Sequence, residues 1–586
     1  MELAKIREQL AFLYGNERAS GLEKQLLGLL NQFRGAYTGP EVGPHQIDEG
    51  DALLITYGDM VGPTDAAGRG FEKLHRFLRR WNQGYFNYLH LLPFHPFTSD
   101  DGFSVVNYRE VEERYGTWED LDALGRSHKL AFDLVINHGS VSSPWFQGFL
   151  KNEAPYDTWY ITRDKDYDYA SVVRPRTHPL LTPFTKADGT TVYVWTTFST
   201  DQVDYDFSNP EVLLEFIKIF LEYVQRGARI VRLDAIAYLW KEDGTPCIHH
   251  PKTHGVVKLL RSIVDLLHLD LLLLTETNVP HEDNISYFGQ GDEAHLVYNF
   301  ALPPLVLHGA LSHDAEPLQS WACKLSEWMN KQTEPLPVFL NFLASHDGVG
   351  LTPAKGLIDE NAFRKTLDRA QQRGALVSYK ASKDGPIPYE LNCSYLSVVS
   401  PPELGGAAER ARAFLATQAI LLAFRGLPAV YFHSWVGSEH WREGVELLGY
   451  KRAINRQKIH LETLESELET EESLRSLVFQ GFRELFEFRQ QEPAFAVSCG
   501  QSVLKTQRSL FCLVRGPDFD GRLVLCFQNL GPDQVDFPTL EGIPHAEPYS
   551  LPQAWACGIQ GWETRWIALG GKRRPRMLIL GPRIRK

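Results

Sequence analysis

The chain has 586 residues, of which 43% are hydrophobic and 12% aromatic, and its formal net charge is −13. This length exceeds the usual size of a single domain, so a large catalytic or binding domain with accessory domains is expected. The strong negative charge argues against nucleic acid or an anionic membrane surface as a partner.

Residues 1–50 are predicted to form two amphipathic helices joined at Ser20–Gly21, followed by a stretch rich in Gly and Pro. The first residues mix charges with apolar side chains at helical spacing and lack the apolar core of a signal peptide. No segment approaches the length of a transmembrane helix. The seven cysteines occur singly and include no CxxC pair, which is typical of a reducing compartment. We therefore expect a cytoplasmic protein.

Eight hydrophobic runs follow in chain order, and each is predicted to be a strand. Continuous apolar runs of this kind suit parallel strands that are buried on both faces. Together they predict a (β/α)8 TIM barrel over residues 51–490. The runs are Ala52–Gly58, Tyr85–Pro93, Leu130–His138, Gly227–Ala235, Leu271–Thr277, His295–Phe300, Val338–Asp347 and Pro428–His433.

Three further segments complete the predicted organisation. Residues 139–200, after the third strand, are too long for an ordinary barrel loop and are predicted to be a functional inserted domain. A second excursion runs from Gly348 to about Pro402, and a charged helical segment covers about 455–490. From Ser498 the pattern changes to short alternating runs, which predict an antiparallel β-domain over residues 498–586.

Polar side chains gather where four of the predicted strands end. Arg232 and Asp234 are two residues apart and share one face of their strand, so the guanidinium keeps the carboxylate ionised and oriented. Taken alone, such a pair is explained equally well by an ordinary buried ion pair as by a catalytic carboxylate. Three other strand ends favour an active site, because barrels build theirs at the C-terminal ends of the strands. These ends carry Asp133, Asn137, His138, Glu276, His346 and Asp347.

These strand ends resemble the signature regions of glycoside hydrolase family 13, the α-amylase family. Asp133-x-x-x-Asn137-His138 resembles the first region, Arg232-x-Asp234-Ala235 the second, Glu276 the third and His346-Asp347 the fourth, while Gln202-Val-Asp204-Tyr-Asp206 is similar to the fifth. The resemblance implies that Asp234 is the nucleophile, Glu276 the general acid and base, and Asp347 the stabiliser of the transition state. It also implies that residues 139–200 are the family's domain B, packed over the active-site mouth.

Within this family, several stretches resemble the sucrose phosphorylase branch. They are Leu91–Phe94 with Ser99–Phe103, Arg174–Arg176 with Trp195–Asp206, Tyr389–Asn392 and Lys451–Arg456. The N-terminal extension and three further segments look most like glucosylglycerate phosphorylases. Those segments are Ile55–Tyr57, Thr275–Asn284 and Leu302–His308. The resemblance covers nearly the whole chain.

The resemblance also implies the residues that bind substrate. Asp100 and Arg452 would clamp the far end of a single glucosyl unit, although Ser99–Gly102 is also ordinary turn chemistry. His138 and His346 would bond other hydroxyls and Phe103 would line the pocket, together with Gln202, Arg232, Tyr238 and Tyr389. There are two departures from close relatives: Glu390 replaces an amide, which puts fructose binding in doubt, and Gly139 replaces a methionine, which suggests a roomier wall.

Phosphate as the second nucleophile requires cations near the acceptor, because the catalytic carboxylates repel an anion. Arg174 and Arg176, separated by the rigid Pro175, are the candidates, since the guanidinium fork binds phosphate in a bidentate manner. The same cations would suit the carboxylate of glycerate. The alternative is that both arginines pair with surface carboxylates.

The predicted function is a retaining α-glucoside phosphorylase, a hexosyltransferase that converts glucosylglycerate and phosphate into α-glucose 1-phosphate and D-glycerate through a β-glucosyl-aspartate. The alternatives are a sucrose or glucosylglycerol phosphorylase, a hydrolase or transglucosylase with the same machinery, or a non-catalytic relative that uses the barrel for binding. We expect no metal and no cofactor, with phosphate as co-substrate, because no acidic loop of the calcium-binding type is present. The expected state is a monomer or a homodimer.

Overall fold

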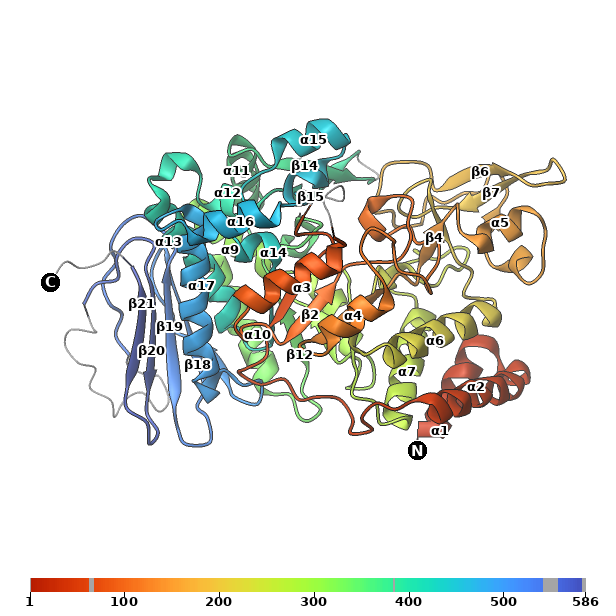
Figure 1. Cartoon of the computed structure of the whole chain (residues 1–586), viewed down its shortest axis with the longest axis horizontal. Helices are drawn as coiled ribbons and strands as arrows, with labels where there is room; N and C mark the ends of the chain where they lie inside the picture. Colours follow the sequence, from red (N-terminus) through yellow and green to blue (C-terminus); the bar gives the residue numbers. More distant parts are fainter. Residues whose placement is uncertain (1, 63–67, 383–384, 541–556, 582–586) are drawn as a thin grey trace.

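A closed barrel of parallel strands forms the centre of the molecule (Figure 1). The computed structural model describes residues 2–62, 68–382, 385–540 and 557–581, and within them eight strands pair in chain order around the ring. The predicted (β/α)8 fold is thus confirmed. The strands are β1 (Leu53–Thr56), β2 (Tyr88–Leu91), β3 (Lys129–Leu134), β9 (Ala228–Leu233), β10 (Leu272–Thr275), β11 (Leu296–Tyr298), β12 (Val338–Asn341) and β16 (Leu427–Tyr431).

Every predicted barrel run extends past the C-terminal end of the strand observed. The run that ends at Asp347, for example, forms a strand only as far as Asn341. The ladders are short because barrel strands are tilted and staggered, so each pairs with its neighbours over few residues. The polar residues at the ends of the runs therefore lie in the loops above the barrel, where they are free to face a common pocket.

Amphipathic helices surround the barrel and cover its outer face (Figure 1). In α6, for example, ten apolar residues are buried while the charged positions face outward. The helices are α3 (Gly70–Trp81), α4 (Trp118–Gly125), α6 (Pro210–Gln225), α7 (Pro251–Leu266), α8 (His281–Ile285), α9 (Leu302–Ser312), α10 (Glu316–Asn330), α13 (Ala407–Ala423), α14 (Phe432–Trp435), α15 (Arg442–Leu448), α16 (Leu461–Glu469) and α17 (Leu474–Gln490). No helix in the described part of the chain is long and apolar enough to cross a membrane.

The N-terminal extension consists of α1 (Glu2–Tyr14) and α2 (Asn16–Ala36), which lie beside α6 and α7 (Figure 1). The predicted break at Ser20–Gly21 is wrong, because both residues lie inside α2. The chain turns at Gly15 instead, where φ is +84°, a left-handed conformation that glycine adopts without a steric cost. Leu10 of α1 and Leu26 of α2 are among the buried residues of these helices.

The segment between β3 and α6 carries its own small sheets (Figure 1). Strand β4 (His138–Ser140) pairs with β8 (Gln202–Asp204), which brings the two ends of the segment together. Between them, α5 (Pro144–Leu150) precedes a three-stranded sheet of β5 (Thr162–Arg163), β7 (Thr191–Trp195) and β6 (Leu181–Thr185). His138 is thereby held directly against the end of β3.

The excursion after β12 forms a second small sheet before the chain returns to α13. Its strands are β13 (Val349–Gly350), β14 (Leu376–Lys380) and β15 (Ile387–Asn392), with β15 in the centre. Helix α11 (Glu360–Gln372) lies between β13 and β14 in sequence, and α12 (Tyr395–Val399) follows β15. Strand β15 carries Tyr389 and Glu390 toward the barrel mouth.

An antiparallel sheet packs at the end of the molecule farthest from β6 and β7 (Figure 1). Its order is β17 (Gln501–Val503), β18 (Leu510–Arg515), β19 (Leu523–Asn529), β20 (Thr564–Leu569) and β21 (Arg576–Leu580), as the alternating pattern predicted. The predicted boundaries of this domain and of the N-terminal extension include residues 1, 541–556 and 582–586, which lie outside the described residues.

Candidate active site

The centre of the site is an arginine bonded to carboxylates from two strands. Arg232, on β9, donates through Nη1 to Asp133 Oδ1 on β3 and, at 2.8 Å, to Asp234 Oδ1. Its Nη2 lies 3.9 Å from Glu276 Oε2, just beyond β10. Because adjacent parallel strands end at the same face, three acids far apart in sequence converge on one guanidinium.

The turn after β9 orients the acid that faces Asp234. Ala235 has a φ of +48°, a left-handed conformation that is strained for alanine. In this conformation its backbone N–H donates to Glu276 Oε2 at 3.1 Å. The turn therefore fixes the side chain of Glu276 beside Asp234. The backbone strain at Ala235 is thus located within the site.

Asp234 and Glu276 form a pair that retains a proton. Burial raises the pKa of Glu276, and the charge of Asp347 raises it further. Burial and the charges of Glu276, Asp133 and Asp347 also raise the pKa of Asp234, against Arg232. Two buried carboxyls this close cannot both ionise. The shorter contact of Arg232 with Asp234 places the negative charge there and leaves the proton on Glu276.

The third acid, Asp347, is held in its charged form. Although burial opposes ionisation, the charges of Arg452 and Arg456 keep the pKa of Asp347 well below its usual range. Arg452 Nη1 lies 2.8 Å from Asp347 Oδ1 and His346 Nε2 lies 3.4 Å from the same oxygen. An ionised Asp347 can stabilise positive charge that develops on a sugar ring.

The far end of the site is an arginine–aspartate cluster. Arg452 Nη1 is 3.5 Å from Asp100, and Arg456 Nη1 is 3.4 Å from Asp100 and 2.8 Å from Asp101. Burial opposes ionisation of Asp101, but Arg456 lowers its pKa to about 2. Sequence reasoning singled out Arg452 and Asp100 but missed Arg456 and Asp101. Both residues lie in segments already noted for their resemblance, Ser99–Phe103 and Lys451–Arg456. That position was the signal in the sequence that could have identified them.

The carboxylate of Glu390 is hydrogen-bonded to Arg452, so it is not a free carboxylate that faces an acceptor. Its carboxylate accepts from Arg452 Nε at 3.0 Å and Nη2 at 2.8 Å, and from Asn392 Nδ2. Only 3% of Glu390 is exposed. This bidentate contact fixes the plane of the guanidinium and leaves Nη1 for Asp100 and Asp347. Glu390 thus orients the guanidinium of Arg452.

Two histidines at the site are neutral, and one of them, His138, lines the pocket. Burial lowers the pKa of His138 to about 4, and its Nε2 bonds the carbonyl of Phe103 at 3.0 Å. Gln202 donates to the same carbonyl at 3.1 Å. Burial also lowers the pKa of His346 strongly, and its ring stacks on Phe103 at 4.8 Å. Arg232 and His346 lie immediately behind the pocket wall and support residues that line it.

The mouth of the pocket contains one of the two predicted arginines. Arg176 lies 5.6 Å above the ring of Tyr389 and 5.8 Å above that of Phe198. Arg174, by contrast, donates to the carbonyl of His178 and lies over Tyr169, so it does not line the pocket. The chain bends from Pro175 to His178, so the two arginines do not share one face as residues i and i+2 of a strand would.

These residues enclose a narrow pocket of about 70 Å³ above the barrel. It suits a small ligand that enters past Arg176 and ends at Arg452. Asn278, which sequence reasoning also missed, lines it next to Glu276. The predicted residues that line the pocket are Asp100, Phe103, His138, Arg176, Gln202, Tyr238, Asp234, Glu276, Asp347, Tyr389, Glu390 and Arg452.

Two features of the wall correct or extend the sequence reading. Gly139 does not make the wall roomier, because a Cβ there would lie 2.0 Å from the hydroxyl of Tyr205, which fills the space. Below it, the Lys241 ammonium lies 2.6 Å from both Asp204 Oδ2 and Asn137 Oδ1, and only 2% of its side chain is exposed. The Lys241 ammonium therefore supplies the positive charge between the side-chain oxygens of Asp204 and Asn137.

Comparison with known proteins identifies relatives over most of the chain. Residues 86–358 match the family model described as the catalytic domain of α-amylase. The glucosylglycerate phosphorylase of Spirochaeta thermophila is 46% identical over 90% of this chain and 89% of its own length. That of Escherichia coli is 44% identical over 76% of this chain and 79% of its own. The crystal structure of sucrose 6F-phosphate phosphorylase from Thermoanaerobacter thermosaccharolyticum shares the fold, with a TM-score of 0.73 at 24% identity, over 90% of this chain and 98% of that one.

Proposed function

The chain belongs to the α-amylase family, glycoside hydrolase family 13, and we propose that it is a glucosylglycerate phosphorylase. It transfers a glucosyl unit reversibly between D-glycerate and phosphate with retention of configuration. The observation that carries this proposal is the convergence of Asp234 and Glu276 beside Arg232 in a pocket that Arg176 also lines. Its high identity to enzymes of that name over most of the chain supports the choice of acceptor.

In the first step the glucosyl unit passes from the substrate to the enzyme. Asp234, oriented by Arg232, attacks the anomeric carbon, while Glu276 donates its proton to the departing oxygen of glycerate. The product is a β-glucosyl-aspartate. Asp347 stabilises the oxocarbenium-like charge, and Arg452 with Asp100 holds the far hydroxyls of the ring.

In the second step phosphate replaces glycerate at the mouth. Both are anions, and Arg176 provides a guanidinium for each in turn. Attack of a phosphate oxygen on the anomeric carbon breaks the ester to Asp234 and gives α-glucose 1-phosphate. Phosphate is already an anion, so this attack needs little help from a base. Attack by a hydroxyl in the reverse direction requires the ionised Glu276 to accept its proton.

The function is tested with α-glucose 1-phosphate and a panel of acceptors. Phosphate release should depend on an acceptor and be fastest with D-glycerate, ahead of fructose and glycerol. Release that is equally fast without any acceptor would show that water is the natural nucleophile, and the protein would be a hydrolase. No release with any acceptor would contradict the phosphorylase assignment as a whole.

Arg176 is expected to determine the preference for an anionic acceptor. Arg176→Ala removes a charge-assisted hydrogen bond worth about 1.5–3 kcal/mol, or about one to two orders of magnitude in kcat/KM. The loss should appear with glycerate and with phosphate, but not with glycerol. The measurement is the ratio of kcat/KM for glycerate and glycerol in the synthetic direction.

Arg174→Ala is the matched control for Arg176, since it removes the same charge from the same loop. Because Arg174 lies over Tyr169 and outside the pocket, its removal should leave the ratio unchanged. An equal loss in both variants would mean that the loop acts through its overall charge and not through contact. A wild-type enzyme that prefers glycerol would contradict the anionic-acceptor proposal but not the phosphorylase proposal.

Glu390 is expected to act on the donor through Arg452. Glu390→Gln loosens the bidentate hold on Arg452 and should lower kcat/KM about tenfold for every glucosyl donor, α-glucosyl fluoride included. The relative use of glycerate, fructose and glycerol should stay the same. A changed acceptor ratio with a normal rate on α-glucosyl fluoride would instead assign Glu390 to the acceptor.

We propose that the enzyme needs no metal or organic cofactor. The Lys241 ammonium already lies between Asn137 and Asp204, so a divalent cation there would face a like charge. Full activity is expected in excess chelator, measured as initial rates before and after prolonged incubation. Loss of activity that added calcium restores would overturn this prediction.

We also propose that the enzyme works in the cytoplasm on small molecules, a glucoside and phosphate, as a monomer or a homodimer. None of its seven cysteines, all of them in the described residues, is in a disulfide, which suits a reducing compartment. A phosphorylase is useful there because its product keeps the energy of the glycosidic bond as a sugar phosphate.

A further inference from the structure

A second, much larger cavity lies at the opposite end of the barrel from the catalytic residues. It has a volume of about 930 Å³ and is lined by the first residues of three adjacent strands, Leu272 of β10, Leu296 of β11 and Val338 of β12. The catalytic carboxylates lie at or beyond the other ends of the strands. We call this space the basal cavity. Its volume falls in the range of small-molecule binding sites.

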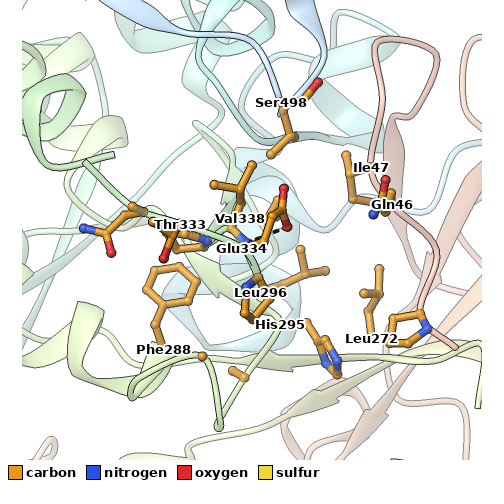
Figure 2. A pocket seen from close by; sticks show the side chains of 18 of the residues that line it. Gln46, Ile47, Leu272, Phe288, His295, Leu296, Thr333, Glu334, Val338 and Ser498 are labelled. Carbon is orange, nitrogen blue, oxygen red and sulfur yellow. Dashed lines mark hydrogen bonds between the residues drawn. The ribbon is translucent and has the colours of Figure 1, made fainter. Parts of the chain in front are cut away.

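The walls of the basal cavity come from segments far apart in sequence (Figure 2). Phe288, Thr333 and Glu334 lie on one side and Gln46 and Ile47 on the other. Ser498, from the connection to the C-terminal sheet, lies across from the strand starts. The linker after α2, the loop before β12 and the connection to the C-terminal sheet therefore all take part in shaping this cavity.

One side of the cavity is aromatic and apolar. The ring of Phe288 lies 6.1 Å from that of Trp328, at 32°, and both line the space. Val338 and, to a small extent, Leu272 extend this apolar surface. Such a surface suits the C–H face of a pyranose ring, which stacks on aromatic side chains in the same way as other apolar groups.

His295, which lines the cavity, has a buried hydrogen-bond donor without a partner among the described residues. His295 Nδ1 accepts from the backbone N–H of Leu273 at 2.9 Å, so in the neutral ring the proton is on Nε2. Burial lowers the pKa of His295 strongly, which keeps the ring neutral. Its Nε2 is buried and lacks an acceptor. A buried unpaired donor is costly, so a ligand oxygen that accepts from it is favoured.

The charge of the lining selects against anions. Among the described residues, three carboxylates line the cavity, those of Asp48, Asp265 and Glu334, but only one guanidinium, that of Arg261. Arg261 is already bonded to Asp265 at 3.0 Å. A phosphate or a glycerate would meet a net negative wall without a free guanidinium from this part of the chain. The side-chain amides of Gln46, Gln290 and Gln332 offer neutral donors and acceptors instead.

We propose that the basal cavity is a binding site for a neutral mono- or disaccharide, separate from the catalytic pocket. The apolar wall takes one face of the sugar, His295 donates to one of its oxygens, and the amides bond its hydroxyls. The site takes neither α-glucose 1-phosphate nor glycerate, because both are anions. This site does not depend on the identity of the acceptor in the reaction.

The test uses the full-length protein labelled with 5-fluorotryptophan and observed by ¹⁹F NMR. The Trp328 resonance is identified as the one that is missing from Trp328→Phe. Maltose, a neutral disaccharide, should shift this resonance in a saturable way, with a Kd on the order of 1 mM. α-Glucose 1-phosphate should leave it in place. No saturable shift up to about 100 mM maltose, where such a site would be full, would overturn the proposal.

Two variants test the named contacts. His295→Asn keeps an acceptor for the Leu273 N–H but removes the Nε2 donor, and should weaken maltose binding about three- to tenfold. Thr333→Trp, at the exposed rim, should fill the cavity and abolish the Trp328 shift. Both variants should retain wild-type rates with α-glucose 1-phosphate and acceptor, which shows that the barrel is intact. Unchanged maltose binding in both would show that the sugar lies elsewhere.

Discussion

Replacing Asp234 by Asn should lower kcat/KM for phosphorolysis by about 10⁴-fold or more. We propose this carboxylate as the nucleophile, and an amide cannot form the β-glucosyl ester on which both half-reactions would depend. The substitution is nearly isosteric and keeps an acceptor for Arg232 Nη1, so the fold should be unaffected. Initial rates of α-glucose 1-phosphate formation, with a thermal unfolding curve for each protein, provide the measurement.

A smaller variant distinguishes a lost nucleophile from a distorted site. Asp234→Ala leaves a space below the anomeric carbon that a small anion can enter. Azide with α-glucosyl fluoride should then restore turnover and yield the β-glucosyl azide, because attack comes from the face that Asp234 occupies. A wild-type rate for Asp234→Asn would contradict a catalytic role for this site. It would instead favour a barrel that only binds its ligand.

Replacing Glu276 by Gln should slow phosphorolysis of the natural glucoside by about 10²- to 10⁴-fold, the usual contribution of general acid catalysis. The departing glycerate oxygen is a poor leaving group without a proton. Because burial raises the pKa of Glu276, the wild-type acid keeps its proton to higher pH than a free glutamic acid would. Activity should fall as the pH rises through that pKa, and Glu276→Gln should lack this alkaline limb.

The choice of glucosyl donor and acceptor separates the roles of Glu276 as an acid and as a base. Fluoride leaves with little help from an acid, and phosphate attacks without a base, so Glu276→Gln should recover much of its rate with α-glucosyl fluoride and phosphate. The same donor with glycerate should stay slow, since a hydroxyl nucleophile still needs the base. Equal recovery with both acceptors would assign Glu276 the role of acid alone.

The sequence by itself determined the barrel and the central acids of its site. The eight runs predict buried parallel strands because apolar side chains occupy most positions on both faces. Arg232, Asp234, Glu276 and Asp347 lie near the C-terminal ends of those runs. Their convergence requires only that parallel strands end on one face of the barrel. Local pattern and chain order therefore sufficed.

The tertiary structure alone decided which side chains act together across loops. Glu390 holds Arg452, although 62 residues separate them, and Arg456 reaches Asp100 and Asp101 from about 350 residues away. No local pattern encodes such pairs, because they depend on where two loops meet above the barrel.

The direction of a side chain within an irregular segment was likewise beyond the sequence. Arg176 faces the pocket while Arg174 turns away from it, and the N-terminal helices break at Gly15 and not at Ser20–Gly21. In strands and helices a fixed period relates sequence to face, but a loop has no such period. The basal cavity, where His295 meets a linker and two loops, exists only once those segments are packed together.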